Sequence, residues 1–152
     1  MEPAGHAVGT SFVRIELNKT LRVPPASAFE YFADPRNRPN WQRSLRRVEL
    51  ITAGPPALGT RWREWPLGLG EVELEIVRFE RDRVWAEEAQ TRLGRLTLVL
   101  VFEPAPTGTR LGVEATLTLP PWASWADRAV APLVRREIEG DLQRAARALA
   151  DA

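Results

Sequence analysis

Residues 122–150 read WASWADRAVAPLVRREIEGDLQRAARALA, and this stretch decides how the rest of the chain has to fold. Its apolar residues recur every three or four positions, a spacing that places them along one face of an α-helix. They are Val130, Leu133, Val134, Ile138, Leu142, Ala145 and Leu149. The other face carries arginine and glutamate, so the stretch predicts one long amphipathic helix that covers an apolar surface elsewhere. Pro132 lies inside it and predicts a kink or a break.

The apolar surface that this helix covers is predicted to be a β-sheet. Seven earlier segments carry strand signals, and several alternate strictly between apolar and polar residues, as a strand with one buried face does. They span residues 11–23, 45–52, 59–65, 71–80, 83–91, 95–103 and 110–119. Short connections join most of them, which favours antiparallel pairing. In the fourth segment Glu71, Glu73 and Glu75 alternate with aliphatic residues, and we expect these glutamates to face solvent.

Two short helices are predicted after the first strand. One follows Pro24-Pro25 and ends at Asp34-Pro35, and the other lies within residues 35–42 and carries Trp41. We therefore expect a single α+β domain over residues 1–152, with residues 1–10 as a flexible tail. One helix is about 10–12 Å wide and does not fill the concave face of a seven-stranded sheet. The remaining space is either filled by side chains or left as a cavity.

The composition excludes several kinds of chemistry. The chain has no cysteine and one histidine, His6. This excludes disulfides, thiolate zinc sites and a cysteine nucleophile, and it argues against a Ser-His-Asp triad or a multi-histidine metal site. The net charge is +1, so the chain lacks the strongly basic composition that is typical of nucleic-acid-binding proteins. We expect no metal, cofactor or nucleic-acid partner, no transmembrane segment and no secretory signal, hence a cytoplasmic location.

Three motifs resemble those of a known family. The first runs from Val23-Pro24 through Ala28-Phe29-Glu30-Tyr31-Phe32-Ala33-Asp34-Pro35 to Trp41, the second is Gly59-Thr60-Arg61-Trp62, and the third is Phe102-Glu103-Pro104 followed by Gly108-Thr109-Arg110-Leu111. With the C-terminal helix, they make the chain similar to the polyketide cyclase/dehydrase-like proteins of the START-like superfamily. That superfamily is also called SRPBCC and includes the birch-pollen-allergen-like proteins.

The resemblance implies a helix-grip fold. In that fold a seven-stranded antiparallel sheet wraps around a long C-terminal helix and leaves a deep hydrophobic cavity. The superfamily includes aromatase/cyclases as well as lipid and hormone carriers. The resemblance therefore implies a fold more firmly than a reaction.

Four tryptophans and one glutamate are the candidate ligand-binding residues. Trp62 and Glu64 lie two positions apart on one strand, so both point into the cavity if that face is concave. Trp41 either lines the cavity or packs in the core. Trp122 and Trp125 begin the C-terminal helix, where they either close the mouth of the cavity or cover one end of the sheet.

Charged residues supply the remaining candidates. Glu64, Glu87 and Glu88 lie on central strands, and each either faces solvent or enters the cavity, where burial raises a carboxyl pKa and suits it to proton transfer. A basic segment without acidic residues either lies on the solvated surface, the reading we favour, or attracts an anionic head group or a membrane surface. It contains Arg36, Arg38, Arg43, Arg46 and Arg47.

Three functions remain open. The first is binding of a hydrophobic small molecule, such as a lipid, an isoprenoid or a polyketide. The second is a cyclase, aromatase or dehydratase that positions a reactive chain and uses Glu64 or Glu88 as its proton-transfer group. The third is a regulatory interaction module with a filled cavity. A homodimer is compatible with all three.

Overall fold

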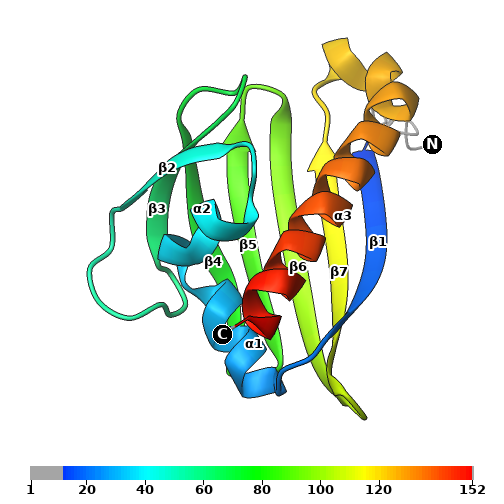
Figure 1. The fold of residues 1–152 in the computed structure, drawn as a ribbon. Coiled ribbons are helices and arrows are strands. Elements are labelled where there is room, and N and C mark those ends of the chain that lie inside the picture. Colours follow the sequence, from blue (N-terminus) through cyan, green and yellow to red (C-terminus); the bar gives the residue numbers. More distant parts are fainter. Residues whose placement is uncertain (1–11, 152) are drawn as a thin grey trace, which may run out of the picture.

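The computed structural model describes residues 12–151, which form one curved sheet wrapped around a long helix (Figure 1). The elements in chain order are β1 (Phe12–Leu21), α1 (Pro25–Ala33), η1 (Pro35–Asn37), α2 (Arg38–Trp41), β2 (Leu45–Leu50), β3 (Arg61–Pro66), β4 (Val72–Glu80), β5 (Val84–Thr91), β6 (Gly94–Ala105), β7 (Gly108–Thr118), η2 (Pro121–Ala126) and α3 (Asp127–Ala150). The predicted strands, short helices and C-terminal helix are thus confirmed. The expected tail at residues 1–10, with His6, lies outside the described residues.

The sheet has seven strands in the order β1-β7-β6-β5-β4-β3-β2, and every neighbouring pair is antiparallel. β1 pairs with β7, so the chain has to cross from one edge of the sheet to the other before β2 begins. α1, η1 and α2 make this crossing on the side of the sheet that α3 also covers (Figure 1). The crossing places α2 in front of the concave face of β3 and β5.

Alternation along each strand sorts the side chains between the two faces of the sheet. Trp62, Leu74 and Leu100 point to the concave face and are buried there. Glu71, Glu73 and Glu75 are exposed, as predicted. The concave face therefore supplies the apolar surface that α3 covers.

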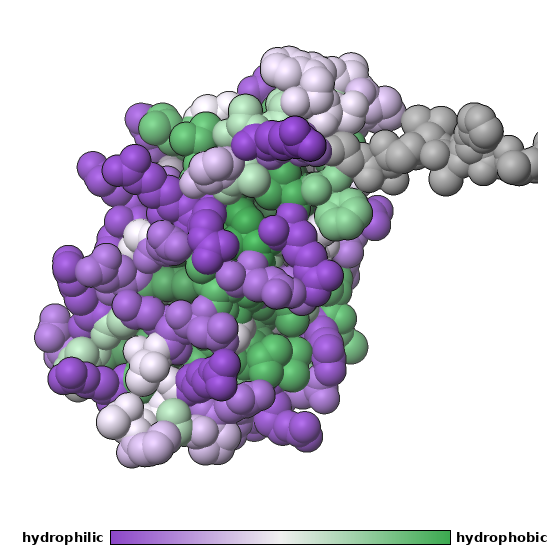
Figure 2. All heavy atoms as spheres, turned by 90° about the vertical axis from the view of Figure 1, so that its right-hand side faces the viewer, coloured by the Kyte–Doolittle hydropathy of each residue, from purple (hydrophilic) through white to green (hydrophobic). Residues whose placement is uncertain are grey.

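The two halves of α3 pack differently. Its buried side chains, Asp141, Leu142, Ala145 and Leu149, all lie in the C-terminal half. The N-terminal half packs on β1 and β7 through Ala131 and Val134, which contact a cluster around Ile15. Figure 2 views the molecule from this side and shows hydrophobic residues flanked by hydrophilic ones. Because the N-terminal half of α3 packs on the edge strand β1 and its neighbour β7, a space remains between this half of the helix and the middle strands.

The helix begins later than predicted and is unbroken. Residues 121–126 form the 3₁₀ turn η2, and α3 then runs from Asp127 to Ala150 through Pro132. Pro132 is the sixth residue of α3, so its missing N–H costs the helix one hydrogen bond, the one to the carbonyl of Arg128 four residues earlier. Pro132 is also exposed, so water can reach the carbonyl group that it leaves unbonded.

Candidate functional site

A cavity of about 380 Å³ lies between the concave face of the sheet and the N-terminal half of α3. Its walls are mainly aliphatic and include Leu74, Ala89, Leu98, Leu117, Val134 and Ile138. Leu93 and Leu133 also line it and are exposed, so the cavity opens to solvent between the β5–β6 turn and α3. Its volume lies within the range of small-molecule pockets, which is roughly 300–1,000 Å³.

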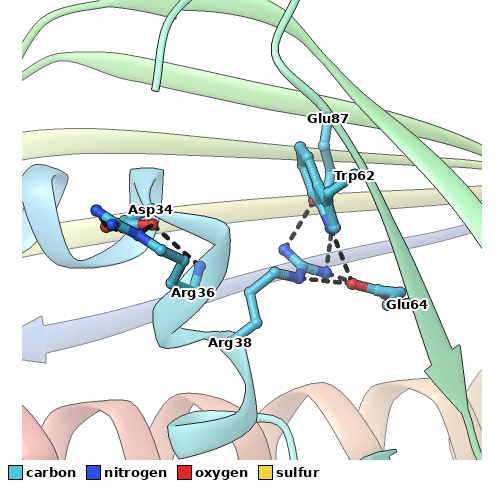
Figure 3. Close-up of polar contacts among 6 residues, drawn as sticks. All are labelled: Asp34, Arg36, Arg38, Trp62, Glu64 and Glu87. Carbon is cyan, nitrogen blue, oxygen red and sulfur yellow. Dashed lines mark hydrogen bonds and ion pairs between the residues drawn. The ribbon is translucent and has the colours of Figure 1, made fainter. Parts of the chain in front are cut away.

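The polar part of the cavity is built around one buried arginine. Arg38, the first residue of α2, is 2% exposed and points at two glutamates from the sheet (Figure 3). Its Nε donates to Glu64 Oε2 at 2.8 Å, and its Nη1 donates to Glu87 Oε2 at 2.8 Å. Its Nη2 reaches both carboxylates, at 3.4 Å to Glu64 Oε1 and 3.2 Å to Glu87 Oε1. We call these three side chains the Arg38 cluster.

Tryptophans complete the surroundings of this cluster. Trp62 Nε1 donates to Glu64 Oε2 at 3.0 Å. The guanidinium carbon of Arg38 lies 5.5 Å from the centre of the Trp41 ring and 5.3 Å from that of Trp62, within the range of cation–π attraction. These contacts hold Arg38 in one orientation.

The local sequence explains why Arg38 points inward. Asp34 caps η1 by accepting the Arg36 backbone N–H at 3.0 Å, and its carboxylate also binds the Arg36 side chain. The Asn37 side chain donates to the carbonyl of Tyr31 at 3.0 Å. These bonds hold the tight turn between α1 and α2, with Arg36 on the surface and Arg38 directed at the sheet (Figure 3).

The cluster carries one positive and two negative charges. Burial raises the pKa of Glu87 to about 7; the Arg38 charge opposes this shift and the Glu64 charge adds to it. Burial alone lowers the pKa of Arg38, but the two carboxylates outweigh it and hold that pKa above its ordinary value. Glu87 is therefore a carboxyl group that changes its protonation near neutral pH.

A further carboxyl group reaches the cavity from α3. Asp141 is buried, and burial raises its pKa to about 6, against hydrogen bonds from Arg144 and from the Arg43 backbone. The Arg43 N–H donates to Asp141 Oδ1 at 3.4 Å, and Arg144 Nε donates to the Trp41 carbonyl at 3.1 Å. Asp141 and Arg144 thus fasten α3 to the segment after α2 beside the cavity.

The candidate residues from the sequence divide between the cavity and its surroundings. Glu64 lines the cavity, and Trp62 is fully buried behind it on the same face, as the alternation indicated. Trp41 is buried against Phe32, with ring centres 5.2 Å apart, beside a separate small cavity of about 40 Å³. Glu88 points to the opposite face of the sheet, where it pairs with Arg95 at 3.4 Å. Glu87 rather than Glu88 is therefore the second glutamate of the site.

Trp122 and Trp125 lie in η2, outside the lining of the cavity. Their exposed fractions are 68% and 81%, and Trp125 Nε1 donates to the Trp122 carbonyl at 3.1 Å. The structure therefore does not bring either tryptophan into the lining of the cavity.

The expectation that the whole basic segment is solvated is wrong for Arg38. Arg36, Arg43, Arg46 and Arg47 are exposed, as favoured, but Arg38 is buried because two carboxylates neutralise it. Its partners lie 26 and 49 positions away in the sequence, so no local spacing signals the pairing. Asp141 was missed for a related reason, because an aspartate between apolar helix positions resembles an ordinary polar residue.

Within residues 12–151, no group of three or more histidine, aspartate or glutamate side chains is arranged to hold a metal ion. Over the same range, none of the helices is both long and apolar enough to cross a membrane.

Comparison with known proteins supports the fold described above. Residues 13–150 match the model of the family described as polyketide cyclase / dehydrase and lipid transport. No curated protein matches the chain.

Similar solved structures include a protein of unknown function from Staphylococcus aureus, with a TM-score of 0.78, 11% identity and coverage of 95% of this chain and 97% of that one. The di-domain ARO/CYC StfQ from the steffimycin biosynthetic pathway has a TM-score of 0.76 and 16% identity, and the match covers 94% of this chain and 54% of StfQ. Ara h 8.0201 has a TM-score of 0.69 and 15% identity, with 93% of this chain and 100% of that chain covered. At these identities the likeness shows a shared helix-grip fold.

Proposed function

The chain belongs to the family of polyketide cyclases, dehydrases and lipid-transport proteins, and from that premise we propose that it binds a hydrophobic small molecule between the sheet and α3. The observation that carries the proposal is the cavity of about 380 Å³, with aliphatic walls and a single polar region. Pockets of this design bind the apolar body of a ligand by burial and orient it through a few polar groups. The ligand would lie along Leu74, Leu98 and Ile138 with its polar end at the Arg38 cluster.

The volume also bears on the size of the ligand. At the liquid volume of about 30 Å³ per molecule, the cavity corresponds to roughly a dozen waters. A ligand of about ten to fifteen non-hydrogen atoms therefore suits it better than a whole phospholipid. The hypothesis of a regulatory module with a filled interior does not fit a cavity of this size.

A thermal-shift screen with small hydrophobic alcohols, phenols and isoprenoids tests the proposal. Ligands that bind the folded state raise the midpoint of unfolding in proportion to ln(1 + [L]/Kd). Ala89→Phe places a ring in the cavity and should abolish the shift, whereas Ala57→Phe in the exposed β2–β3 loop should leave it unchanged. If no ligand shifts the midpoint, or if both variants respond alike, the cavity is not the binding site.

The second candidate is a cyclase or dehydratase, and the observation that favours it is the raised pKa of Glu87, about 7. A group with a pKa near the working pH is an effective proton carrier. In a cyclisation, the Glu87 carboxylate would take a proton from a carbon between two carbonyl groups. The resulting enolate would attack another carbonyl carbon of the same chain, and the Glu87 acid would return the proton to the alkoxide formed. Glu64 already accepts three hydrogen bonds, so Glu87 has more free acceptor capacity for this task.

Turnover of a short poly-β-ketone tests the enzymatic alternative. Glu87→Gln should lower kcat by about a hundredfold or more, while Glu88→Gln, which alters the next residue on the outer face, should leave it unchanged. If the protein binds the poly-β-ketone but does not convert it, binding without catalysis is the better description of its function.

A further inference from the structure

We propose that the cavity selects ligands whose polar end donates hydrogen bonds and carries no negative charge, such as a hydroxyl or an amine, over ligands that end in a carboxylate. The inference rests on the proposed function in one respect, namely that a ligand occupies this cavity. It adds the chemical class of the polar end.

The first reason is the balance of charges around the cavity. Its lining includes one basic side chain, Arg38, and four acidic ones: Glu64, Glu87, Glu137 and Asp141. Glu64, Glu87 and Asp141 are buried, so water screens their charges only weakly. Arg144 lies outside the lining but pairs with Asp141, so Arg38 and Arg144 balance two of the three buried carboxylates and one negative charge remains. An anionic end would therefore be repelled, whereas a neutral or cationic one would not.

The second reason is that most N–H groups of Arg38 are already hydrogen-bonded and therefore not free to bind an anion. A guanidinium has five N–H groups, and Arg38 already makes four hydrogen bonds to Glu64 and Glu87. Trp41 and Trp62 lie within cation–π distance of it. The two-pronged binding of a carboxylate by arginine would require Arg38 to leave a glutamate with its charge buried and unpaired.

The third reason is that acceptor capacity remains. A carboxylate offers about four lone-pair positions, and each oxygen of Glu87 accepts one hydrogen bond from Arg38. The bonds to Asp141 from Arg43 and Arg144 both fall on Oδ1, and Oδ2 accepts none from the described residues. A ligand hydroxyl or amine can donate to these oxygens without displacing an existing bond.

Three probes with one alkyl chain and different ends give the test: decanol, decylamine and decanoate. Their dissociation constants are measured by titration calorimetry with the intact protein at about pH 8, which is above the raised pKa values of Glu87 and Asp141 and above the pKa of decanoate. We expect decanol and decylamine to bind about tenfold or more tightly than decanoate. Equal or tighter binding of decanoate overturns the inference while leaving the proposed function intact.

A naphthol and the matching naphthoate repeat the comparison with a rigid ring in place of the chain. The naphthol should again bind more tightly than the naphthoate. If none of the five probes binds, both the proposed function and this inference fail, which separates that outcome from a failure of charge selection alone.

Two glutamates adjacent in the sequence supply a matched pair of variants. Glu87→Gln removes one buried negative charge and should reduce the preference for decanol over decanoate several-fold. Glu88→Gln removes the same charge from the outer face and should leave the preference unchanged. If Glu87→Gln does not fold, Asp141→Asn serves the same purpose on α3. A preference that is equal in the wild type and in all folded variants contradicts the assignment to these carboxylates.

Discussion

Arg36 and Arg38 stand two residues apart, and their environments are opposite. The Arg36 side chain is 68% exposed and pairs with Asp34 from its own turn, at 2.7 Å. The Arg38 side chain is 2% exposed and pairs with Glu64 and Glu87 from two strands of the sheet. The surface pair shapes a local turn, while the buried cluster ties α2 to the sheet and forms the polar part of the cavity.

The difference shows how burial sets the importance of an ion pair. At the surface, water and dissolved ions screen much of the attraction between opposite charges, so an exposed ion pair contributes little to the stability of the fold. A buried charge without a partner is strongly unfavourable, so removing one member of a buried cluster costs far more than the net stability the cluster provides. The predictions below test that contrast, and the substitutions among them run from the largest expected effect to the smallest.

Replacing Arg38 should have the largest effect. Arg38→Met leaves Glu64 and Glu87 facing each other without a cation and should lower the free energy of unfolding by about 3–5 kcal/mol. Urea denaturation followed by circular dichroism measures this. Arg36→Met is the control and should leave the urea midpoint unchanged. Similar midpoints for the two variants would show that burial does not distinguish these arginines.

Trp62→Phe should have the next largest effect. The change keeps an aromatic ring on the concave face but removes the Nε1–H that donates to Glu64 at 3.0 Å. The expected loss is about 1.5–3 kcal/mol, the range for hydrogen bonds to charged groups. The matched variant Trp125→Phe removes an exposed donor, and its unfolding midpoint should barely change. A larger loss for Trp125→Phe would contradict the contrast.

Raising the pH from about 5 to about 8 should lower the free energy of unfolding by roughly 2–4 kcal/mol, at about 1.4 kcal/mol per unit of pKa difference between the folded and unfolded states. Glu87 and Asp141 have pKa values raised in the folded state, to about 7 and about 6. A raised carboxyl pKa means that the folded state binds the proton more tightly than the unfolded chain does. The resulting stabilisation is complete below the ordinary carboxyl pKa and is lost as the pH rises through 6 and then 7.

Glu87→Gln and Asp141→Asn serve as the controls for this pH effect. Each variant should flatten its part of the curve of unfolding midpoint against pH. Stability that rises from pH 5 to pH 8 in the wild type would be the wrong sign for this explanation.

Removing the Glu88–Arg95 pair should have the smallest effect. Both side chains are substantially exposed and lie 3.4 Å apart on the outer face. Glu88→Gln should change the free energy of unfolding by less than about 0.5 kcal/mol. A thermal melt compared with that of Glu87→Gln measures the difference between the two faces of β5.

Periodicity predicted the fold because it depends on residues near each other in the sequence. The three-and-four spacing from Val130 to Leu149 located α3, and alternation placed Trp62 and Glu64 on the concave face. The same rule failed to separate Glu87 from Glu88. Residues 84–87 on β5 are all buried, so burial does not alternate along this part of the strand, and the apolar pattern does not reveal which face each glutamate occupies.

Arg38 was beyond local reasoning for a different reason. The burial of an arginine depends on carboxylates that the tertiary fold brings to it, here from β3 and β5. Its neighbours Pro35 and Pro39 signal a tight turn but not the direction in which each side chain points. The charge of the cavity therefore became visible only once the sheet and α2 were placed together.

The most direct test follows the indole N–H resonances of the six tryptophans during a titration with decanol. Each tryptophan gives one such signal in a ¹H–¹⁵N spectrum, and single Trp→Phe variants assign them. The Trp62 signal reports on Glu64, to which it donates, whereas Trp122 and Trp125 lie on the surface. Binding at the Arg38 cluster predicts that the Trp62 signal moves and saturates while those of Trp122 and Trp125 stay in place. Movement of the surface signals with an unchanged Trp62 signal would contradict a ligand site inside the cavity.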